Sequence, residues 1–278
     1  MIGAIIGDIA GSRFEFKPIK SKDFELLLKG ENYLSKKQTF KEFQENCRFT
    51  DDTVMTVAVA NALLEANGNY ENLKQLVVEN MKNFGHKYPY AGYGAKFNRW
   101  LSLPIAEPYN SYGNGSAMRI SAVPYFAKSI DEVKELSKLV TEVTHNHPEG
   151  IKGAEAVACC IWLSLNKHSK IEIEEFVKEN YYNLDYDYKE LVKTYRHDES
   201  CQNSVPQSIF AFLISKDYED AIRTAISMGG DADTMACIAG SIAQAYYGLP
   251  KQLESKGLEF LTDDLKQVVL KFQNRFKC

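Results

Sequence analysis

Apolar residues recur with a helical period along almost the whole chain. One face is formed by residues three or four positions apart, as on one side of an α-helix: Ile130, Val133, Leu136, Leu139, Val140 and Val143. Period and capping signals together predict helices over 2–11, 53–66, 71–84, 130–143, 149–165, 204–214, 217–228, 233–247 and 262–276. No alternating run longer than a few residues predicts a strand. We therefore predict an all-α protein and, without any low-complexity linker, a single compact multi-helix domain over 1–278.

Glycines form a stripe along the first predicted helix. Gly3, Gly7 and Gly11 recur every four residues, although each glycine costs a helix roughly 1 kcal/mol relative to alanine. Such a stripe indicates that another backbone approaches closely. Asp8 is notable because it lies near the end of this apolar segment. By contrast, the acidic stretch 171–190 is most simply a solvated face.

Two segments far apart in the sequence are dense in side-chain oxygens. Thr50-Asp51-Asp52-Thr53 and Asp231-Ala232-Asp233-Thr234 each end in Asp-Thr and lead into a small, apolar helical stretch. Taken singly, each could be an ordinary N-cap, because Asp and Thr oxygens accept the free N–H groups of a first turn. A cap needs one oxygen, however, and each segment supplies three. Carboxylates gathered in one pocket repel one another unless a cation lies among them, and all-oxygen ligands suit Mg²⁺, Mn²⁺ or Ca²⁺.

A glycine-rich turn forms a third candidate element. The segment 111–119, Ser-Tyr-Gly-Asn-Gly-Ser-Ala-Met-Arg, is predicted to enter a helix. Glycines free the backbone to point several N–H groups at one anion, and the helix start adds a favourable dipole, so phosphate or diphosphate is the natural guest. A tight Asn-Gly turn without a ligand is the alternative, and Arg119 could equally form a salt bridge at the edge of the core.

Two histidines follow at His145 and His147. They could bind a soft metal, but no cysteine or third histidine lies close in the sequence, so we favour pocket-lining or capping roles over a zinc site.

Composition narrows the class further. The net charge is −4 and the pI about 5.8, so the chain lacks the excess of positive charge that a nucleic-acid-binding protein carries. The six cysteines show no Cys-x-x-Cys spacing, and Cys159 and Cys160 are adjacent within a helical pattern. A reduced, cytoplasmic compartment fits best. The apolar run at residues 2–10 is too short to span a bilayer, so we expect no membrane association.

Taken in order, these motifs resemble the ADP-ribosylglycohydrolase family, which includes the dinitrogenase reductase-activating glycohydrolase and the eukaryotic ADP-ribosyl-acceptor hydrolases. The resemblance runs from residue 1 to about residue 250 and is carried by Gly7-Asp8, Gly11-Ser12, Glu15, Thr50-Asp51-Asp52-Thr53, residues 113–119, Thr144-His145 and residues 229–234. The Gly-Tyr-Gly stretch at 92–94, with Phe97 and Trp100, is more similar to the bacterial branch.

The resemblance implies an all-α fold with a centre of two divalent cations, Mg²⁺ or Mn²⁺. The metal ligands would be Thr50, Asp51, Asp52, Asp231, Asp233 and Thr234. Catalysis would involve Glu15, which matches the family's acidic residue near the metals, together with Asp51 and Asp233. Substrate would contact Ser111, Tyr112, Gly113, Asn114, Gly115, Ser116, Met118 and His145, with the diphosphate cradled by 113–118.

The adenine platform departs from the family pattern. Tyr112 matches an aromatic residue that packs on the adenine, but the second stacking position falls near Ala106. Tyr109, Tyr93 or His145 could substitute for the missing ring.

The implied activity is hydrolytic removal of ADP-ribose from a modified protein or from a small conjugate. We take an arginine acceptor, bound through an N-glycosidic bond, as the first expectation; the residues do not decide between arginine and serine. We expect a monomer or weak oligomer. An ADP-ribose-binding module that has lost catalysis stays open. A different metalloenzyme acting on diphosphates is a poorer fit, because the Asp-Asp-x-x-Asp spacing of terpenoid synthases would need an aspartate where Met55 stands.

Overall fold

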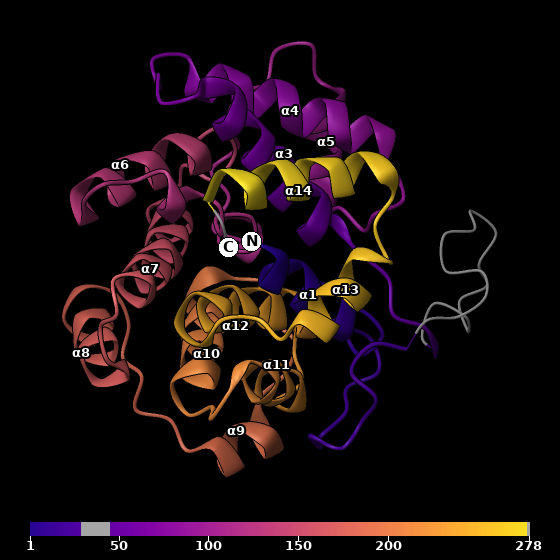
Figure 1. Ribbon diagram of the computed structural model, residues 1–278, viewed down its shortest axis with the longest axis vertical. Coiled ribbons are helices and arrows are strands. Elements are labelled where there is room, and N and C mark those ends of the chain that lie inside the picture. Colours follow the sequence, from indigo (N-terminus) through magenta and orange to yellow (C-terminus); the bar gives the residue numbers. More distant parts are fainter. Residues whose placement is uncertain (29–44, 277–278) are drawn as a thin grey trace.

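The computed structural model describes residues 1–28 and 45–276. Within these ranges the chain forms α-helices, two short 3₁₀ helices and no strand, which confirms the all-α prediction (Figure 1). The α-helices are α1 (Ile2–Gly11), α3 (Asp51–Ala66), α4 (Leu73–Lys87), α5 (Ala95–Ser102), α6 (Ile130–Thr141), α7 (Pro148–Leu165), α8 (Lys170–Asn180), α9 (Tyr188–Thr194), α10 (Cys201–Leu213), α11 (Tyr218–Ser227), α12 (Ala232–Tyr247), α13 (Lys251–Leu258) and α14 (Asp263–Phe276). The 3₁₀ helices are η1 (Asn114–Ser116) and η2 (Val123–Tyr125).

Helix α10 begins earlier than the sequence predicts. A start at Ser204, with Pro206 in the first turn, was expected; the helix instead begins at Cys201 and contains Pro206. The earlier turn is anchored because the Cys201 N–H donates to the carbonyl of Tyr112 at 2.9 Å. Pro206 is the sixth residue of the helix, so it lies beyond the first turn and cannot donate a backbone hydrogen bond to the carbonyl four residues earlier.

The acidic stretch 171–190 is more than a solvated face. It contains most of α8 and the start of α9. Ser169 and Glu172 form a capping box at the start of α8, and Ile173 and Val177 are buried. The charge run hid this short apolar face, because its two buried positions lie four apart with two of the three residues between them acidic.

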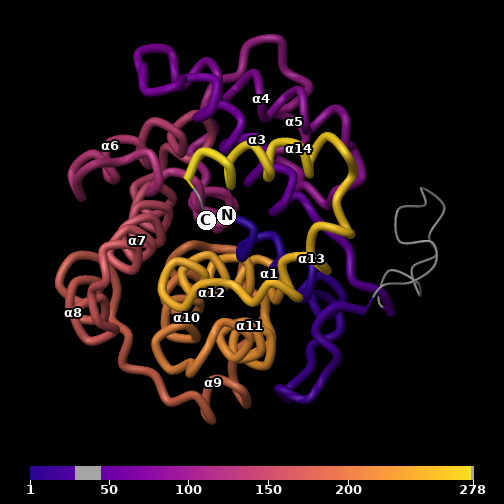
Figure 2. The backbone as a smooth tube through the Cα atoms, viewed as in Figure 1, coloured from indigo at the N-terminus to yellow at the C-terminus, as the bar shows by residue number. Residues whose placement is uncertain are grey.

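Helix α1 packs directly against α12 along the glycine stripe. Figure 2 shows the two helices next to each other. A Cβ atom added at Gly7 would lie 2.1 Å from the carbonyl oxygen of Ala236, and one at Gly11 would lie 2.4 Å from that of Ala232. A Cβ atom added at Gly240 of α12 would likewise lie 2.4 Å from the carbonyl oxygen of Gly3. The close approach that the stripe predicts is therefore present, and it fixes the start of α12 beside the end of α1.

One hydrophobic cluster unites the helices around this pair. It includes buried residues of α1, α3, α7, α10, α12 and α14, and α14 lies across α3 (Figure 1).

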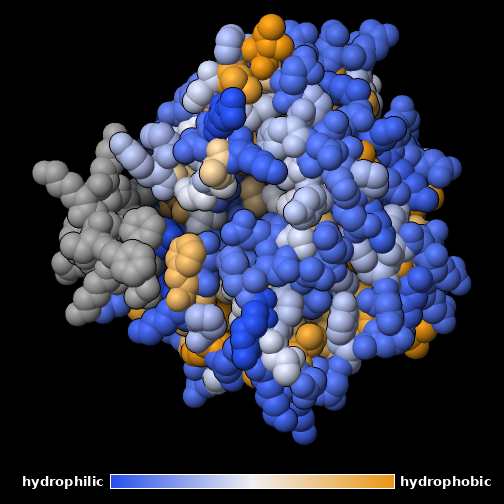
Figure 3. Space-filling model, turned by 180° about the vertical axis from the view of Figure 1, so that it is seen from behind, coloured by the Kyte–Doolittle hydropathy of each residue, from blue (hydrophilic) through white to orange (hydrophobic). Residues whose placement is uncertain are grey.

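The single domain over 1–278 stays a prediction, since its bounds include residues outside the described ranges. Among the described residues no helix is long and apolar enough to cross a bilayer, and the face drawn in Figure 3 is mostly hydrophilic with small separate hydrophobic areas.

Candidate active site

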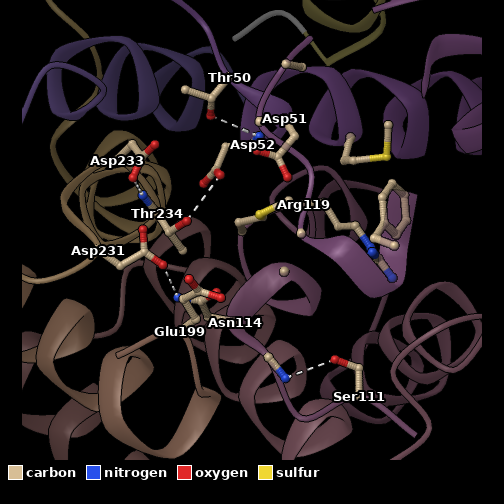
Figure 4. Close-up of a pocket in the computed structure, with 18 of the residues that line it drawn as sticks. Thr50, Asp51, Asp52, Ser111, Asn114, Arg119, Glu199, Asp231, Asp233 and Thr234 are labelled. Atoms are coloured by element: carbon tan, nitrogen blue, oxygen red, sulfur yellow. Dashed lines mark hydrogen bonds between the residues drawn. The ribbon is translucent and has the colours of Figure 1, made fainter. Parts of the chain in front are cut away.

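The two oxygen-rich segments meet in space, as Figure 4 shows. One lies at the start of α3 and the other at the start of α12. The Thr234 hydroxyl donates to Oδ2 of Asp52 at 3.1 Å and so links the two helix starts directly. Carboxylate oxygens of Glu15, Asp231 and Asp233 all lie within 4.8 Å of one another. Residues separated by some 180 positions thus form one acidic cluster.

Asp8 of α1 holds the start of α3 in place. Its buried carboxylate accepts from the backbone N–H of Thr50 at 2.9 Å and of Thr53 at 3.1 Å, and also from both threonine hydroxyls. An aspartate on one helix therefore satisfies the free N–H groups at the start of another. The sequence marked Asp8 as unusual but assigned it no role, because its partners Thr50 and Thr53 lie more than 40 residues away along the chain.

Ordinary capping explains only part of the cluster. The Thr50 hydroxyl accepts from the N–H of Asp52 at 3.2 Å, as an N-cap does. Asp231 occupies the N-cap position of α12 without making a cap bond, and its carboxylate accepts from the side-chain amide of Asn114 at 2.7 Å. Oδ1 of Asp52 is buried and has no hydrogen-bond partner. Asp233 does accept from the N–H of Thr234 in its own helix at 3.1 Å, but Asp231 and Oδ1 of Asp52 make no such cap bond and lie in the cluster.

Burial and mutual repulsion raise the pKa values of these carboxyls. Burial, followed by the charge of Asp233, raises the pKa of Glu15 to about 8. Burial raises the pKa of Asp231 to about 7. Asp51 and Asp52 have pKa values well above the usual range because of burial and then of neighbouring carboxylates. Without a cation the cluster retains protons at neutral pH.

The donors present fit a hard divalent cation. They are carboxylate and hydroxyl oxygens, the ligand type of Mg²⁺ and Mn²⁺. The Cys237 thiol donates to the carbonyl of Met118 at 3.3 Å, and burial raises its pKa well above the usual value, so it is not a thiolate ligand. The buried, unpartnered Oδ1 of Asp52 is the kind of atom that a cation would satisfy.

A pocket of about 410 Å³ opens beside the cluster, within the size range of small-molecule sites. Most of the predicted site residues line it: Glu15, Thr50, Asp51, Asp52, Ser111, Gly113, Asn114, Gly115, Met118, His145, Asp231, Asp233 and Thr234. Of the three proposed replacements for an adenine-stacking ring, Tyr109 and His145 line it and Tyr93 does not.

Tyr112 and Ser116 are not part of the pocket wall. Tyr112 is half exposed, and its ring packs edge-on against that of His147 at 5.4 Å. The Ser116 hydroxyl donates to the carbonyl of Gly150 at 2.8 Å and so fastens the turn to α7. The motif match placed both residues on the substrate; the structure turns one outward and uses the other to support the turn.

The glycine-rich turn does not enter an α-helix, contrary to the sequence prediction. It forms η1 and further turns, because most of its bonds are of the i to i+3 kind and only the Met118 N–H reaches back four residues, to the Asn114 carbonyl. Besides the N–H groups bonded within the turn, that of Gly113 donates to the Ser111 hydroxyl at 3.2 Å and that of Asn114 to the Glu199 carbonyl at 2.7 Å. The turn therefore offers an anion fewer backbone donors than expected and no long helix dipole.

Arg119 is buried behind this turn and forms no salt bridge among the described residues, so the core-edge salt bridge is wrong. Its guanidinium donates to the Thr144 hydroxyl at 2.7 Å, and burial lowers its pKa to about 10. His147 caps α7, since its Nδ1 accepts from the N–H of Glu149, whereas His145 faces the pocket. The two histidines thus have the capping and lining roles that the sequence favoured.

Three further charged residues that the sequence did not single out line the pocket: Arg48, Lys96 and Glu199. Arg48 immediately precedes the Phe49-Thr50-Asp51 segment, and its charge acts on those of Asp233 and Glu15. None of the three follows a motif that would have marked it in advance.

Comparisons with known proteins agree on one family. The sequence profile described as ADP-ribosylglycohydrolase matches residues 1–277. The proteins named ADP-ribosylhydrolase ARH3 are 27% identical in Gallus gallus, over 89% of this chain and 84% of the relative, and 27% identical in Homo sapiens, over 92% and 86%. A solved structure titled ADP-ribosylglycohydrolase-related protein complex superimposes with a TM-score of 0.68 over 98% of this chain and 94% of that chain; at 20% identity it supports the fold alone.

Proposed function

Because the chain belongs to the ADP-ribosylglycohydrolase family, we propose that it hydrolyses the glycosidic bond between ADP-ribose and a modified acceptor at the acidic pocket. The observation that carries the proposal is the meeting of the α3 and α12 starts with Glu15 around one cluster of oxygens. A family member that kept only ADP-ribose binding would have no need of so many buried carboxylates in one place, since they destabilise the fold unless a cation or proton neutralises them.

We further propose a centre of two divalent cations, Mg²⁺ or Mn²⁺. Its ligands would be Thr50, Asp51, Asp52, Asp231, Asp233 and Thr234. Bound there, the ions would supply Lewis acidity toward the ribose hydroxyls and a water molecule. The amide of Asn114 would keep the Asp231 carboxylate in its present orientation, since the two groups are hydrogen-bonded at 2.7 Å.

Glu15 is the residue best placed to handle a proton. Its carboxyl belongs to the acidic cluster and lines the pocket. It is not among the proposed metal ligands, so its carboxyl would stay available to accept and release a proton, as a general acid or base must. As the glycosidic bond breaks, positive charge develops on the ribose, and Asp51 and Asp233 would stabilise that charge. The pocket walls would hold the sugar and exclude bulk water.

For the acceptor we propose a protein arginine, joined through an N-glycosidic bond. Glu199 supports this choice, because it lines the pocket outside the proposed ligand set and a carboxylate attracts a cationic guanidinium. Arg48 acts in the opposite sense, since its charge lies close to those of Glu15 and Asp233. A serine acceptor, which is neutral, is therefore the second arm of the test.

The test is release of ADP-ribose from arginine-modified and serine-modified peptides with Mg²⁺, Mn²⁺ or EDTA. We expect release with metal and its loss in EDTA, with faster turnover of the arginine peptide. Release from the serine peptide alone would refute the acceptor and leave the hydrolase. Tight binding of free ADP-ribose without turnover of either peptide would instead indicate a binding module on this scaffold.

A further inference from the structure

We propose that Arg119 and Thr144 are positioning residues that fix His145 in its Nε2-protonated form, so that this N–H points beside the glycine turn as a donor to an anionic oxygen of the ligand. The inference deepens the proposed function, because it assigns a donor for the diphosphate of ADP-ribose. It rests on a short chain of buried hydrogen bonds behind the pocket wall.

The chain runs through the Thr144 hydroxyl. Oγ1 of Thr144 lies 2.7 Å from a guanidinium nitrogen of Arg119 and 2.7 Å from Nδ1 of His145. All three side chains are buried. An arginine can only donate, so Thr144 accepts from Arg119 and has one proton left to give.

That proton has one acceptor within reach among the described residues, namely Nδ1 of His145. If His145 were instead protonated on Nδ1, the hydroxyl oxygen would accept twice and its own proton would be buried without a partner. Leaving a buried donor unsatisfied is costly, and the arrangement that satisfies every group is favoured. Nδ1 is therefore the acceptor, and the neutral ring carries its proton on Nε2.

The Nε2 edge of the ring faces the turn. A Cβ atom placed on Gly115 would lie 3.4 Å from Nε2, and one on Gly113 would lie 3.7 Å from it. No hydrogen bond of Nε2 is formed within the part of the chain that the structure describes, and His145 lines the pocket. Because the N–H groups of Gly113 and Asn114 are already bonded, a side-chain donor here replaces part of what the backbone does not offer.

The charges around the ring keep it neutral. Burial, followed by the positive charge of Arg119, holds the pKa of His145 well below its usual value. The other titratable groups facing this cluster are Tyr109, whose ring packs against that of His145, and Cys201 of α10. Both are neutral near pH 7, since burial raises their pKa values to about 12. The donor should therefore persist across the neutral range.

The test combines the ring's protonation state with ligand affinity. Two-bond ¹H–¹⁵N correlations of ¹⁵N-histidine-labelled protein report which ring nitrogen is protonated, and a His145→Gln variant identifies the signal among the five histidines. We expect a single Nε2-protonated tautomer in the ligand-free protein from pH 6 to 8. In Thr144→Val the Nδ1-protonated form should appear, and affinity for free ADP-ribose in calorimetry should fall roughly tenfold, as for loss of a hydrogen bond to a charged group.

Two variants keep the test specific. Thr144→Ser retains the hydroxyl and should restore both tautomer and affinity. Thr141→Val removes a hydroxyl that is buried nearby without a hydrogen-bond partner, and should change neither. In Arg119→Met the threonine loses its donor and becomes free to accept, so the Nδ1-protonated form should gain population even with Thr144 present.

The outcomes separate cleanly. An Nδ1-protonated ring in the wild type, or Thr144→Val with unchanged tautomer, would overturn the positioning role. A changed tautomer with unchanged ADP-ribose affinity would overturn the donor's contact with ligand. Absence of ADP-ribose binding by the wild type would refute the proposed function and the ligand contact, while the ligand-free spectra would still decide the positioning.

Discussion

In EDTA, the free energy of unfolding should fall as the pH rises from 6.5 to 7.5. Glu15 and Asp231 have native pKa values of about 8 and 7, against usual values of 4.5 and 3.8. In this window the native state therefore binds more protons than the unfolded chain, and stability decreases with pH. Unfolded histidines still titrate in the lower half of this window, and because native His145 is held neutral, its contribution opposes the fall by about 0.4 kcal/mol.

The size of this fall in stability follows from the raised pKa values of Glu15 and Asp231. Integrating the proton difference over this one pH unit gives about 1.2 kcal/mol for Glu15 and about 0.7 kcal/mol for Asp231. Glu15 is partly exposed to solvent, which screens its interactions, so the expected fall is roughly 1–2 kcal/mol. Asp51, Asp52 and Asp233 act in the same direction, because their pKa values are raised too.

Urea unfolding in EDTA at pH 6.5, 7.0 and 7.5 measures the effect. Asp233→Asn should flatten the slope, since it removes the carboxylate that helps to raise the pKa of Glu15. Asp264→Asn is the control: beside Lys87 its pKa is about 2, so it is ionised in both states throughout the window and the slope should persist. Mn²⁺ at a hundred times its dissociation constant should add about 2.7 kcal/mol at a given pH. A wild-type stability that is flat or rising in EDTA would refute the reasoning.

Three substitutions test the rest of the site. Asp233→Asn should lower metal content at least tenfold and abolish ADP-ribose release, because an amide is a weak partner for a hard dication; near-wild-type values for both would mean that the residue is only a cap, a role that asparagine fills equally well. Glu15→Gln should leave metal content and ADP-ribose affinity largely intact and slow release by roughly 10²–10⁴-fold, the usual contribution of a general acid or base; unchanged release would remove it from catalysis. Gly115→Val should weaken ADP-ribose binding at least tenfold with metal content unchanged, since its side chain would lie beside His145 Nε2 in the pocket; calorimetry showing wild-type affinity in the folded variant would exclude the turn from binding.

The sequence predicted those features that depend on local spacing. The helical period is a property of neighbouring residues, so most helices and the all-α class followed from it. The stripe of Gly3, Gly7 and Gly11 predicted a close backbone contact, because only a glycine tolerates a carbonyl oxygen at the position of its Cβ. Local pattern failed where a few buried positions were masked by charge, as at Ile173 and Val177 of α8.

The sequence also nominated the two oxygen-rich segments, because three oxygens exceed what one helix cap uses. It could not supply their partners. Asp8 binds the start of α3, Asn114 binds Asp231, and Arg119 reaches Thr144 only after distant segments fold together. Nor could it show that the Ser116 hydroxyl donates to the Gly150 carbonyl or that the Tyr112 ring packs against His147; the substrate contacts assigned to both residues stay a prediction.

The division has a physical reason. Residue type and spacing fix which side chains a helix presents and which atoms could bind a cation, and these were readable in the chain. Other properties depend on atoms that distant segments of the chain contribute. They are the burial of a side chain, the charges around a carboxyl group and the direction in which a hydroxyl donates its proton. The raised pKa of Glu15 and the neighbours that direct His145 toward the glycine turn were therefore decided by the tertiary structure alone.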